Sequence, residues 1–293
     1  MQIKKIIELG ILIEPTVAKE LNLMPEIQFN TLISKLTTLD AKPMVLDAEM
    51  VKRLTAVPAK LVKQVQPRKE FSMPELVSAW NNRFSILQKA LMRRPELSNP
   101  VSIKNANGRC TVIGTVNVRD KIFIEDPTGA IELRAPSNIR VFTDDVVGIV
   151  GTVLHGAMSA EEIFFPDVPM QQPKQIECTI SICPANITMQ SDFVLEAKEN
   201  EIDWFDCNGI SVMTAKISEQ DKKKFGASEN AAIEILKRRT LGTAPFDVIE
   251  PVPDVLFIQG AENFVSHHKG TTVVGFSKAA RINMRDRSVE FGE

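Results

Sequence analysis

The sequence contains no tyrosine, two tryptophans and three histidines among its 293 residues. His155, His267 and His268 are too few for a metal enzyme that takes several imidazole ligands from separate parts of its chain. The four cysteines are scattered rather than spaced as a disulfide framework. They predict a reducing, intracellular setting and buried, unreactive thiols.

Long apolar runs are also missing, and Glu8 follows the short apolar stretch at the start of the sequence. We therefore expect neither a membrane span nor a secretory leader, and a cytoplasmic location. The formal net charge is -2, which argues against a protein that coats nucleic acid by charge alone. Positions 1–100, however, hold 15 basic and 10 acidic residues, so the positive charge is concentrated there.

Four sequence regions differ in pattern. Residues 1–54 predict a compact helical module, in which Phe29, Leu32 and Leu36 share one stripe and Asp47 caps a later helix. Residues 55–70 predict a basic, solvated linker, because prolines interrupt it and four Lys or Arg residues occur in it.

Residues 71–170 predict a helix followed by a β-barrel. Ser72 is positioned to cap the helix, and an apolar residue recurs every three or four positions from Leu76 to Leu91. From Val101 the period becomes two, with glycine-interrupted strands up to Phe165. Several short strands within about 70 residues fit a small closed barrel of the OB type. Gly151-Thr-Val-Leu-His-Gly156 has P-loop glycine spacing but lacks the Lys-Ser/Thr that follows, so it predicts a hairpin.

Residues 171–293 begin with a second linker and continue as a mixture of strands and helix. The clearest helix is predicted to start at a Ser228 cap, to have Lys237-Arg-Arg239 in its last turn and to end at Gly242. Lys222-Lys-Lys224 precedes it, and a solvated loop is favoured there over a binding patch.

Three stretches together resemble the small subunit of archaeal family D DNA polymerase, which is related to the eukaryotic B subunits. They are Trp80-Asn-Asn-Arg-Phe84; the series from Val112-Ile-Gly-Thr-Val116 through Ile124-Glu-Asp-Pro-Thr-Gly-Ala-Ile131 and Asp144-Asp-Val-Val-Gly-Ile-Val-Gly151 to Phe165-Pro-Asp-Val-Pro169; and Ile235-Leu-Lys-Arg-Arg239 with Val252-Pro-Asp-Val-Leu-Phe257. The resemblance covers nearly the whole chain, with a large internal deletion. It implies a multidomain α+β protein with a small helical N-terminal module, an OB-fold β-barrel and a remnant calcineurin-like phosphoesterase domain over 171–293.

Active members of that family have a two-metal 3′–5′ exonuclease site, built from Asp-x-His, Gly-Asp, Gly-Asn-His, a lone His and Gly-His-x-His. Here Gly260-Ala-Glu-Asn263 stands in place of Gly-His-x-His, and Ser211-Val-Met-Thr-Ala215 lacks the lone histidine. The resemblance therefore implies a truncated, inactive phosphoesterase with no metal and no cofactor. The expected function is a non-catalytic accessory subunit that scaffolds the large catalytic subunit in DNA replication, at the nucleoid of an archaeal-type cell. It would contact DNA through that complex.

A basic stretch from Lys52 to Arg94 and a basic edge of the barrel supply the candidate DNA contacts. For the stretch, a solvated linker with a well-capped helix is the simpler interpretation, and backbone phosphate contact is the alternative. On the barrel, base stacking is the alternative to ordinary domain packing. The candidates are Lys63, Arg68, Lys69, Arg83, Arg93, Arg94, Arg119, Lys121, Phe123 and Arg134.

Two other functions remain open from the sequence. One is a stand-alone OB-fold protein that binds single-stranded DNA or regulates another protein, which salt-sensitive oligonucleotide binding would favour. The other is a residual metal-dependent 3′–5′ exonuclease with a rebuilt site around His267 and His268. Adjacent strand residues face opposite ways, so a shared metal at these two histidines is disfavoured, and a turn between strands is the preferred interpretation.

Overall fold

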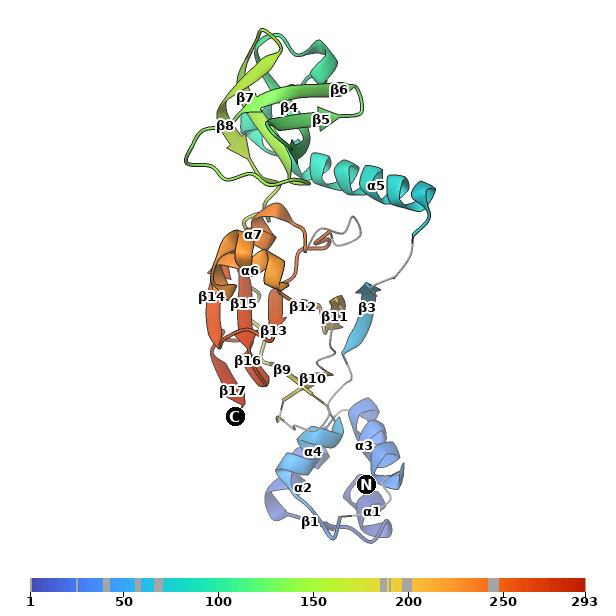
Figure 1. Ribbon diagram of the computed structural model, residues 1–293. Helices are drawn as coiled ribbons and strands as arrows, with labels where there is room; N and C mark the ends of the chain where they lie inside the picture. The colour runs from blue at the N-terminus through green and yellow to red at the C-terminus, as the bar shows by residue number, and fades with distance from the viewer. Residues whose placement is uncertain are drawn as a thin grey trace.

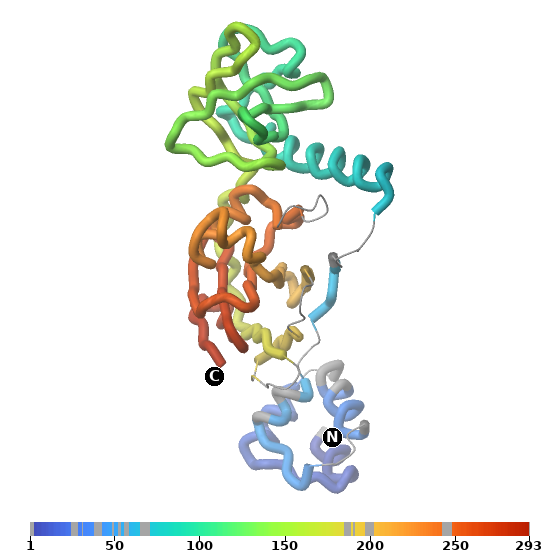
Figure 2. The backbone as a smooth tube through the Cα atoms, viewed as in Figure 1, coloured from blue at the N-terminus to red at the C-terminus, as the bar shows by residue number. Residues whose placement is uncertain are grey.

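The computed structural model describes residues 2–24, 26–38, 43–55, 59–65, 71–184, 189, 191–196, 202–241 and 248–292. Three bodies lie in a row in Figure 1: a helical N-terminal module at one end, a closed barrel at the other and a C-terminal unit between them. Figure 2 shows that the chain passes the middle body, enters the barrel and then returns. The architecture is mixed α+β, as predicted, and it is rich in sheet.

The N-terminal module contains the predicted helices. Its elements are α1 (Gln2–Glu8), β1 (Leu12–Ile13), α2 (Pro15–Leu23), α3 (Glu26–Thr38), β2 (Val45–Leu46) and α4 (Ala48–Thr55). Ile6, Leu21 and Phe29 meet in its buried core. The predicted cap of α4 is present, because the Met50 backbone N–H donates to Asp47 Oδ1 at 2.7 Å. The sequence did not predict the two-residue parallel pair of β1 and β2.

The predicted linker over 55–70 is interrupted by a strand, which corrects that prediction. Strand β3 (Lys60–Val65) pairs antiparallel with β11 (Ile202–Cys207) of the C-terminal unit. Lys63 Nζ lies 4.4 Å from the ring centroid of the buried Trp204, so the ammonium group of the strand contacts the face of the indole. Lysines are common on edge strands, where they discourage aggregation, and a basic composition therefore does not exclude a strand.

Helix α5 (Met73–Leu91) leads into the barrel with the predicted capping box. The Ser72 N–H donates to a Glu75 carboxylate oxygen at 3.0 Å, and the Ser72 side chain accepts in return from the backbone of the first turn. Leu87 and Leu91 are fully buried, and they pack against the barrel together with Leu97 and Val146. The helix therefore forms one body with the barrel.

Five strands close the barrel in the order β4-β5-β6-β8-β7, with β6 and β8 parallel and every other pair antiparallel. They are β4 (Gly108–Val118), β5 (Ile122–Asp126), β6 (Gly129–Arg134), β7 (Val146–Leu154) and β8 (Ala157–Phe164). A closed barrel of this kind is compatible with the predicted OB fold. The predicted hairpin at Gly151–Gly156 is confirmed: His155 and Gly156 have φ of 51° and 76° between β7 and β8, the conformation that a tight hairpin turn requires.

The C-terminal unit stacks two sheets and covers one of them with helices. The larger sheet has the order β14-β15-β13-β12-β11-β3 and the smaller β10-β9-β16-β17. A core of Ile182, Phe257 and Phe276 lies between the sheets, and a second core with Ile235 and Leu236 lies under the helices. The elements not yet given are β9 (Thr179–Cys183), β10 (Phe193–Glu196), β12 (Ile210–Lys216), α6 (Glu219–Phe225), α7 (Ser228–Arg238), β13 (Val255–Gln259), β14 (Phe264–His268), β15 (Thr271–Phe276), β16 (Ala279–Asn283) and β17 (Val289–Gly292).

Three local predictions in this unit need correction. Ser228 is the first helical residue of α7, and Ala227 occupies the cap without a side-chain bond. The helix ends at Arg238, because Arg239 follows it with a left-handed φ of 53°. The predicted stop, Gly242, lies outside the described residues. Lys222–Lys224 form the last turn of α6 rather than a loop, because Ser218 caps that helix by accepting from the Asp221 N–H at 3.0 Å.

Gly151 provides a test of the barrel closure. A β-bulge brings its strand so close to β8 that a Cβ at Gly151 would overlap the Ser159 carbonyl oxygen. We predict that Gly151→Ala lowers the free energy of unfolding by about 1–3 kcal/mol, as overpacking does. Gly129→Ala is the matched control, since a Cβ there meets nothing within 4 Å. Urea denaturation followed by circular dichroism measures both, and equal stability of the two variants would contradict the predicted clash.

Candidate functional site

The barrel meets the C-terminal unit along a seam defined by loop 135–145, residues 165–170 and helices α6 and α7. At its centre Arg238 Nε lies 3.1 Å from Asp145 Oδ1, and the side chains are 5% and 7% exposed. Arg238 also donates to the Arg140 carbonyl at 3.1 Å and pairs with Glu234. The Phe142 N–H donates to Asp145 at 2.9 Å. Nearly every polar atom of this buried pair therefore has a partner, the condition under which such a pair is tolerated.

Burial of Asp145 disfavours its ionised form and raises the pKa of its carboxyl, while the neighbouring Arg238 opposes that rise. Three phenylalanine rings surround the guanidinium. Its central carbon lies 4.3 Å from the centroid of Phe165, 4.8 Å from Phe225 and 5.5 Å from Phe142. Phe142 and Phe225 meet edge to face at 5.2 Å. Barrel and helix thus enclose one cation with aromatic faces from both sides.

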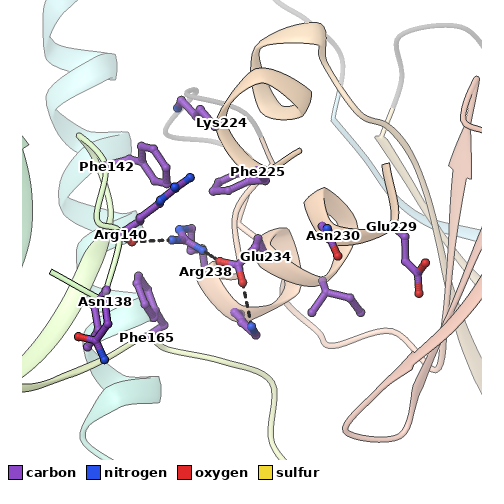
Figure 3. A pocket seen from close by; sticks show the side chains of 13 residues that line it. Asn138, Arg140, Phe142, Phe165, Lys224, Phe225, Glu229, Asn230, Glu234 and Arg238 are labelled. Atoms are coloured by element: carbon purple, nitrogen blue, oxygen red, sulfur yellow. Dashed lines mark hydrogen bonds and ion pairs between the residues drawn. The ribbon is translucent and has the colours of Figure 1, made fainter. Parts of the chain in front are cut away.

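A cavity of about 480 Å³ opens beside this cage (Figure 3). The barrel loop supplies Asn138, Arg140 and Phe142 to its wall, and α6 and α7 supply the opposite wall. Its lining combines phenylalanine rings with charged and amide side chains, so it can accommodate a ligand that has both a flat apolar part and a charged part. The residues on the helical side are Lys224, Phe225, Glu229, Asn230, Ile233, Glu234, Lys237 and Arg238.

A second cluster holds the chain where it leaves the barrel. Asp167 accepts from Lys269 at 2.6 Å, contacts His268 Nε2 at 2.8 Å and lies 3.6 Å from Arg94. Burial raises the pKa of the Asp167 carboxyl, but the Lys269 and His268 hydrogen bonds outweigh it, and the net shift is below the ordinary value. Asp167 therefore links helix α5, the returning chain and the β14–β15 turn.

Next to this cluster lies another cavity, of about 500 Å³, lined in part by Arg93, Arg94, Arg239 and Lys269. Arg239 is buried, donates to the Ile249 carbonyl at 3.1 Å and lies 3.5 Å from Glu250. The structure thus brings together the two helix-terminal arginines that the sequence singled out, Arg93 and Arg94. Arg93 is exposed, whereas Arg94 is engaged with Asp167.

The remaining candidates from the basic stretch lie apart. Arg83 is 4% exposed and donates to the Asp144 carbonyl at 2.7 Å, so it is buried and fastens α5 to the barrel. Lys63 lies on β3 over Trp204. Arg68 and Lys69 lie outside the described residues.

The barrel candidates gather on one face of β5 and β6. Phe123 is half-buried there, and the neighbouring cations are balanced by carboxylates: Arg119 by Glu125 at 3.5 Å, and Lys121 by Glu132 at 2.7 Å. Arg134 lies 3.9 Å from the same Glu132. These ion pairs reduce the positive electrostatic potential of the β5–β6 face. Contact between this face and DNA stays a prediction.

The two adjacent histidines end strand β14, and the predicted turn begins at Lys269, one residue later. His268 faces Asp167, while His267 Nδ1 lies 3.3 Å from Thr272 Oγ1. Within the described ranges, no three His, Cys, Asp or Glu side chains are grouped as metal ligands. Burial raises the pKa of the Cys178 thiol to about 11 and of Cys207 to about 12, which fits unreactive core cysteines.

Sequence reasoning missed the central residues of the seam. Arg238 was interpreted as part of a basic helix end, and Asp145 as part of a family stretch. Arg238 and Asp145 are 93 positions apart in the chain. No local signal identifies such a pair.

No family model matches the sequence. It is similar to the DNA polymerase II small subunit of Methanothermobacter thermautotrophicus, at 30% identity over 125 residues that cover 36% of this chain and 26% of that protein. It is also similar to the small subunits of Pyrococcus abyssi (29% identity, 46% of this chain and 26% of that protein) and Pyrococcus horikoshii (26%, 57% and 31%). The chain is a distant relative of these subunits. The matches span about a quarter to a third of their length.

No described helix combines the length and the apolar character that crossing a bilayer requires. Separately, the similarity to polymerase small subunits agrees with the family resemblance that the three sequence stretches indicate.

The buried pair at the seam is testable by a double-mutant cycle. We predict that Arg238→Met lowers the free energy of unfolding by about 3–5 kcal/mol, because it leaves Asp145 buried without its partner. Asp145→Asn combined with Arg238→Met should cost less than the sum of the two single changes. Lys237→Met is the control, since its pair with Glu234 is partly exposed and should contribute under about 1 kcal/mol. Additive effects of the two seam substitutions would contradict direct coupling.

Asp167 makes stability depend on acid pH. Its folded pKa is depressed, so its contribution is fully present above the unfolded pKa of about 3.9 and is lost as the pH falls through the lower folded value. We predict that Asp167→Asn destabilises the chain by about 1–3 kcal/mol at pH 5 and that the difference from wild type shrinks below about pH 4. Urea titrations at the two pH values measure this. A difference that grows on acidification would show that the sign is wrong.

Proposed function

We propose that this chain is a non-catalytic accessory subunit of a DNA polymerase similar to the archaeal family D enzymes, and that it scaffolds the large catalytic subunit at the nucleoid. The observation that carries the proposal is the similarity to three curated proteins, each a DNA polymerase II small subunit. A small subunit by name implies a larger partner chain. DNA would be reached chiefly through that partner.

The two larger bodies of the structure support this proposal. The barrel has the order β4-β5-β6-β8-β7 with one parallel pair, the topology expected for an OB fold. We infer that the C-terminal unit is a remnant phosphoesterase-like domain, since Gly260-Ala-Glu-Asn263 follows a buried parallel strand, β13. Ligands of open sheets gather at such strand ends. Ala261 stands there as a buried apolar residue, which cannot ligate a metal.

Scaffolding requires a rigid surface rather than a reacting group. The seam supplies rigidity, because the Arg238–Asp145 pair and the Asp167 cluster fix the barrel against the C-terminal unit at two points. A partner that contacts both bodies then meets a preformed shape and loses less conformational entropy on binding. Arg93 and the β5–β6 face remain the proposed DNA contacts within such a complex.

Complex formation is the direct test. We predict that the chain, co-expressed with the polymerase large subunit of its cell, elutes with it as one stoichiometric species by size exclusion with light scattering. The complex should survive about 0.5 M salt, where exposed charge pairs are largely screened. The individually expressed chains, mixed after purification, control for co-folding. A monomer that ignores the large subunit would refute the scaffold.

The absence of a catalytic role has its own assay. We predict no manganese-dependent release of nucleotides from a 3′ end by the chain beyond the level of His267→Ala/His268→Ala, because His268 is held by Asp167 and His267 faces Thr272. Release that disappears with both histidines would instead establish a nuclease.

A further inference from the structure

The cavity beside the aromatic cage is not explained by the scaffold role. It measures about 480 Å³, within the range of small-molecule sites, and it lies between loop 135–145 and helices α6 and α7. Phe142, Phe165 and Phe225 are each half-buried, so part of every ring remains at its wall. The Asp145–Arg238 pair beneath accounts for the packing of these rings but not for the open space beside them.

Positive charge exceeds negative charge on this wall. Arg140, Lys224, Lys237 and Arg238 face Glu229 and Glu234, and Glu234 is engaged by both Lys237 and Arg238. Within the described part of the chain, neither Arg140 nor Lys224 forms an ion pair with a carboxylate. Lys224 Nζ lies 5.8 Å from the centroid of the Phe142 ring. Burial raises the pKa of the Asp144 carboxyl, and the charges of Arg83 and Lys224 only partly oppose that rise. In Figure 3 the Arg140 side chain extends from the barrel loop toward α6 on the same side as Lys224.

Two amide side chains complete the wall, Asn138 from the barrel loop and Asn230 from α7. Both are exposed, and no described residue forms a hydrogen bond with either amide group. An amide offers a donor and an acceptor together, the combination that reads the edge of a nucleobase. Aromatic faces, two cations and two amides therefore converge from two separate bodies on one space.

We propose that this cavity binds a nucleotide of single-stranded nucleic acid, with the base against Phe165 and Phe225 and the backbone phosphate on Arg140 and Lys224. Stacking on aromatic rings beside a positively charged groove is the general way in which single strands are held without sequence preference. The site differs from the β5–β6 face, because its cations belong to loop 135–145 and to α6, and its rings belong to the segment that follows β8 and to α6. It is a property of this chain alone and does not depend on a polymerase partner.

Charge reversal tests the phosphate contacts. The probe is a fluorescently labelled oligothymidylate of about 16 nucleotides, an upper site size for one such barrel, bound to the full chain. We expect Arg140→Glu/Lys224→Glu to weaken binding at least about tenfold and to reduce the slope of log K against log salt by about 1.4, since two phosphate contacts are lost. Lys223→Glu/Lys278→Glu is the control with the same net charge, because both lysines are exposed and lie off the cavity wall. Equal weakening by both double variants would overturn the proposal.

Ring substitutions test the stacking. Phe165→Leu and Phe225→Leu remove the flat face but keep apolar volume, and each should weaken binding about fivefold or more while the salt slope stays the same. Thermal melting of each variant excludes unfolding as the cause, and Arg140→Gln/Lys224→Gln supplies a milder second variant should a reversal fail to fold. Unchanged affinity in a folded ring variant would show that no base stacks on that ring and would overturn this part of the proposal.

Competitors identify the ligand. The proposal expects unlabelled oligothymidylate to displace the probe, and free thymidine monophosphate at the same nucleotide concentration to leave it bound. Displacement by the mononucleotide would show a free-nucleotide site, and displacement by an oligoglutamate peptide of equal charge would show an acidic-peptide site. Either result overturns the single-strand proposal, as does failure of the wild-type chain to bind the probe. Loss of binding on Lys121→Glu/Arg134→Glu alone would move the site to the β5–β6 face.

Discussion

The arrangement of the two larger bodies depends on one buried ion pair, Arg238 with Asp145. Removing each charge from water costs several kcal/mol, so the pair is tolerable only with good geometry and further partners. The Phe142 N–H, the Arg140 carbonyl, Glu234 and three aromatic rings supply them. Because each partner belongs to either the barrel or the helices, the pair is satisfied in one relative orientation. Orientation, and not only stability, is what it contributes.

The Asp167 cluster completes this constraint at the outer end of the seam. One carboxylate shared by Lys269, His268 and Arg94 holds the returning chain, α5 and the β14–β15 turn together. The two anchors differ in character: the Arg238–Asp145 pair is buried among three aromatic rings, whereas the Asp167 carboxylate is shared by Lys269, His268 and Arg94. Between them they leave a solid junction on which the proposed scaffold role and the proposed nucleotide site both rely.

Local patterns predicted much of the fold, and contacts distant in sequence explain the errors. Ser72, the apolar stripe of α5 and the Gly151–Gly156 hairpin depend on neighbours within a few residues, and the structure confirms them. Strand β3 was taken for a linker because its lysines look solvated, and only Trp204 shows why a strand forms there. The seam could not be predicted, since Arg238 resembles any basic helix end until Asp145 is placed against it. Likewise, the sequence indicates a surface position for Arg83, and only its hydrogen bond to the distant Asp144 carbonyl explains its burial.

Strand β3 also determines how the molecule can be divided. It precedes the barrel in sequence yet forms the edge of a sheet whose other strands all follow the barrel. A cut after residue 170 would therefore leave β3 without its neighbour on one fragment and leave the β11 edge uncovered on the other. A fragment that contains the complete larger sheet must include residues 59–65 together with the C-terminal unit. A circularly permuted chain, or a chain split in two and recombined, would have to restore the pairing of β3 with β11. In topological terms, the barrel is an insertion within the middle body, not a module added before it.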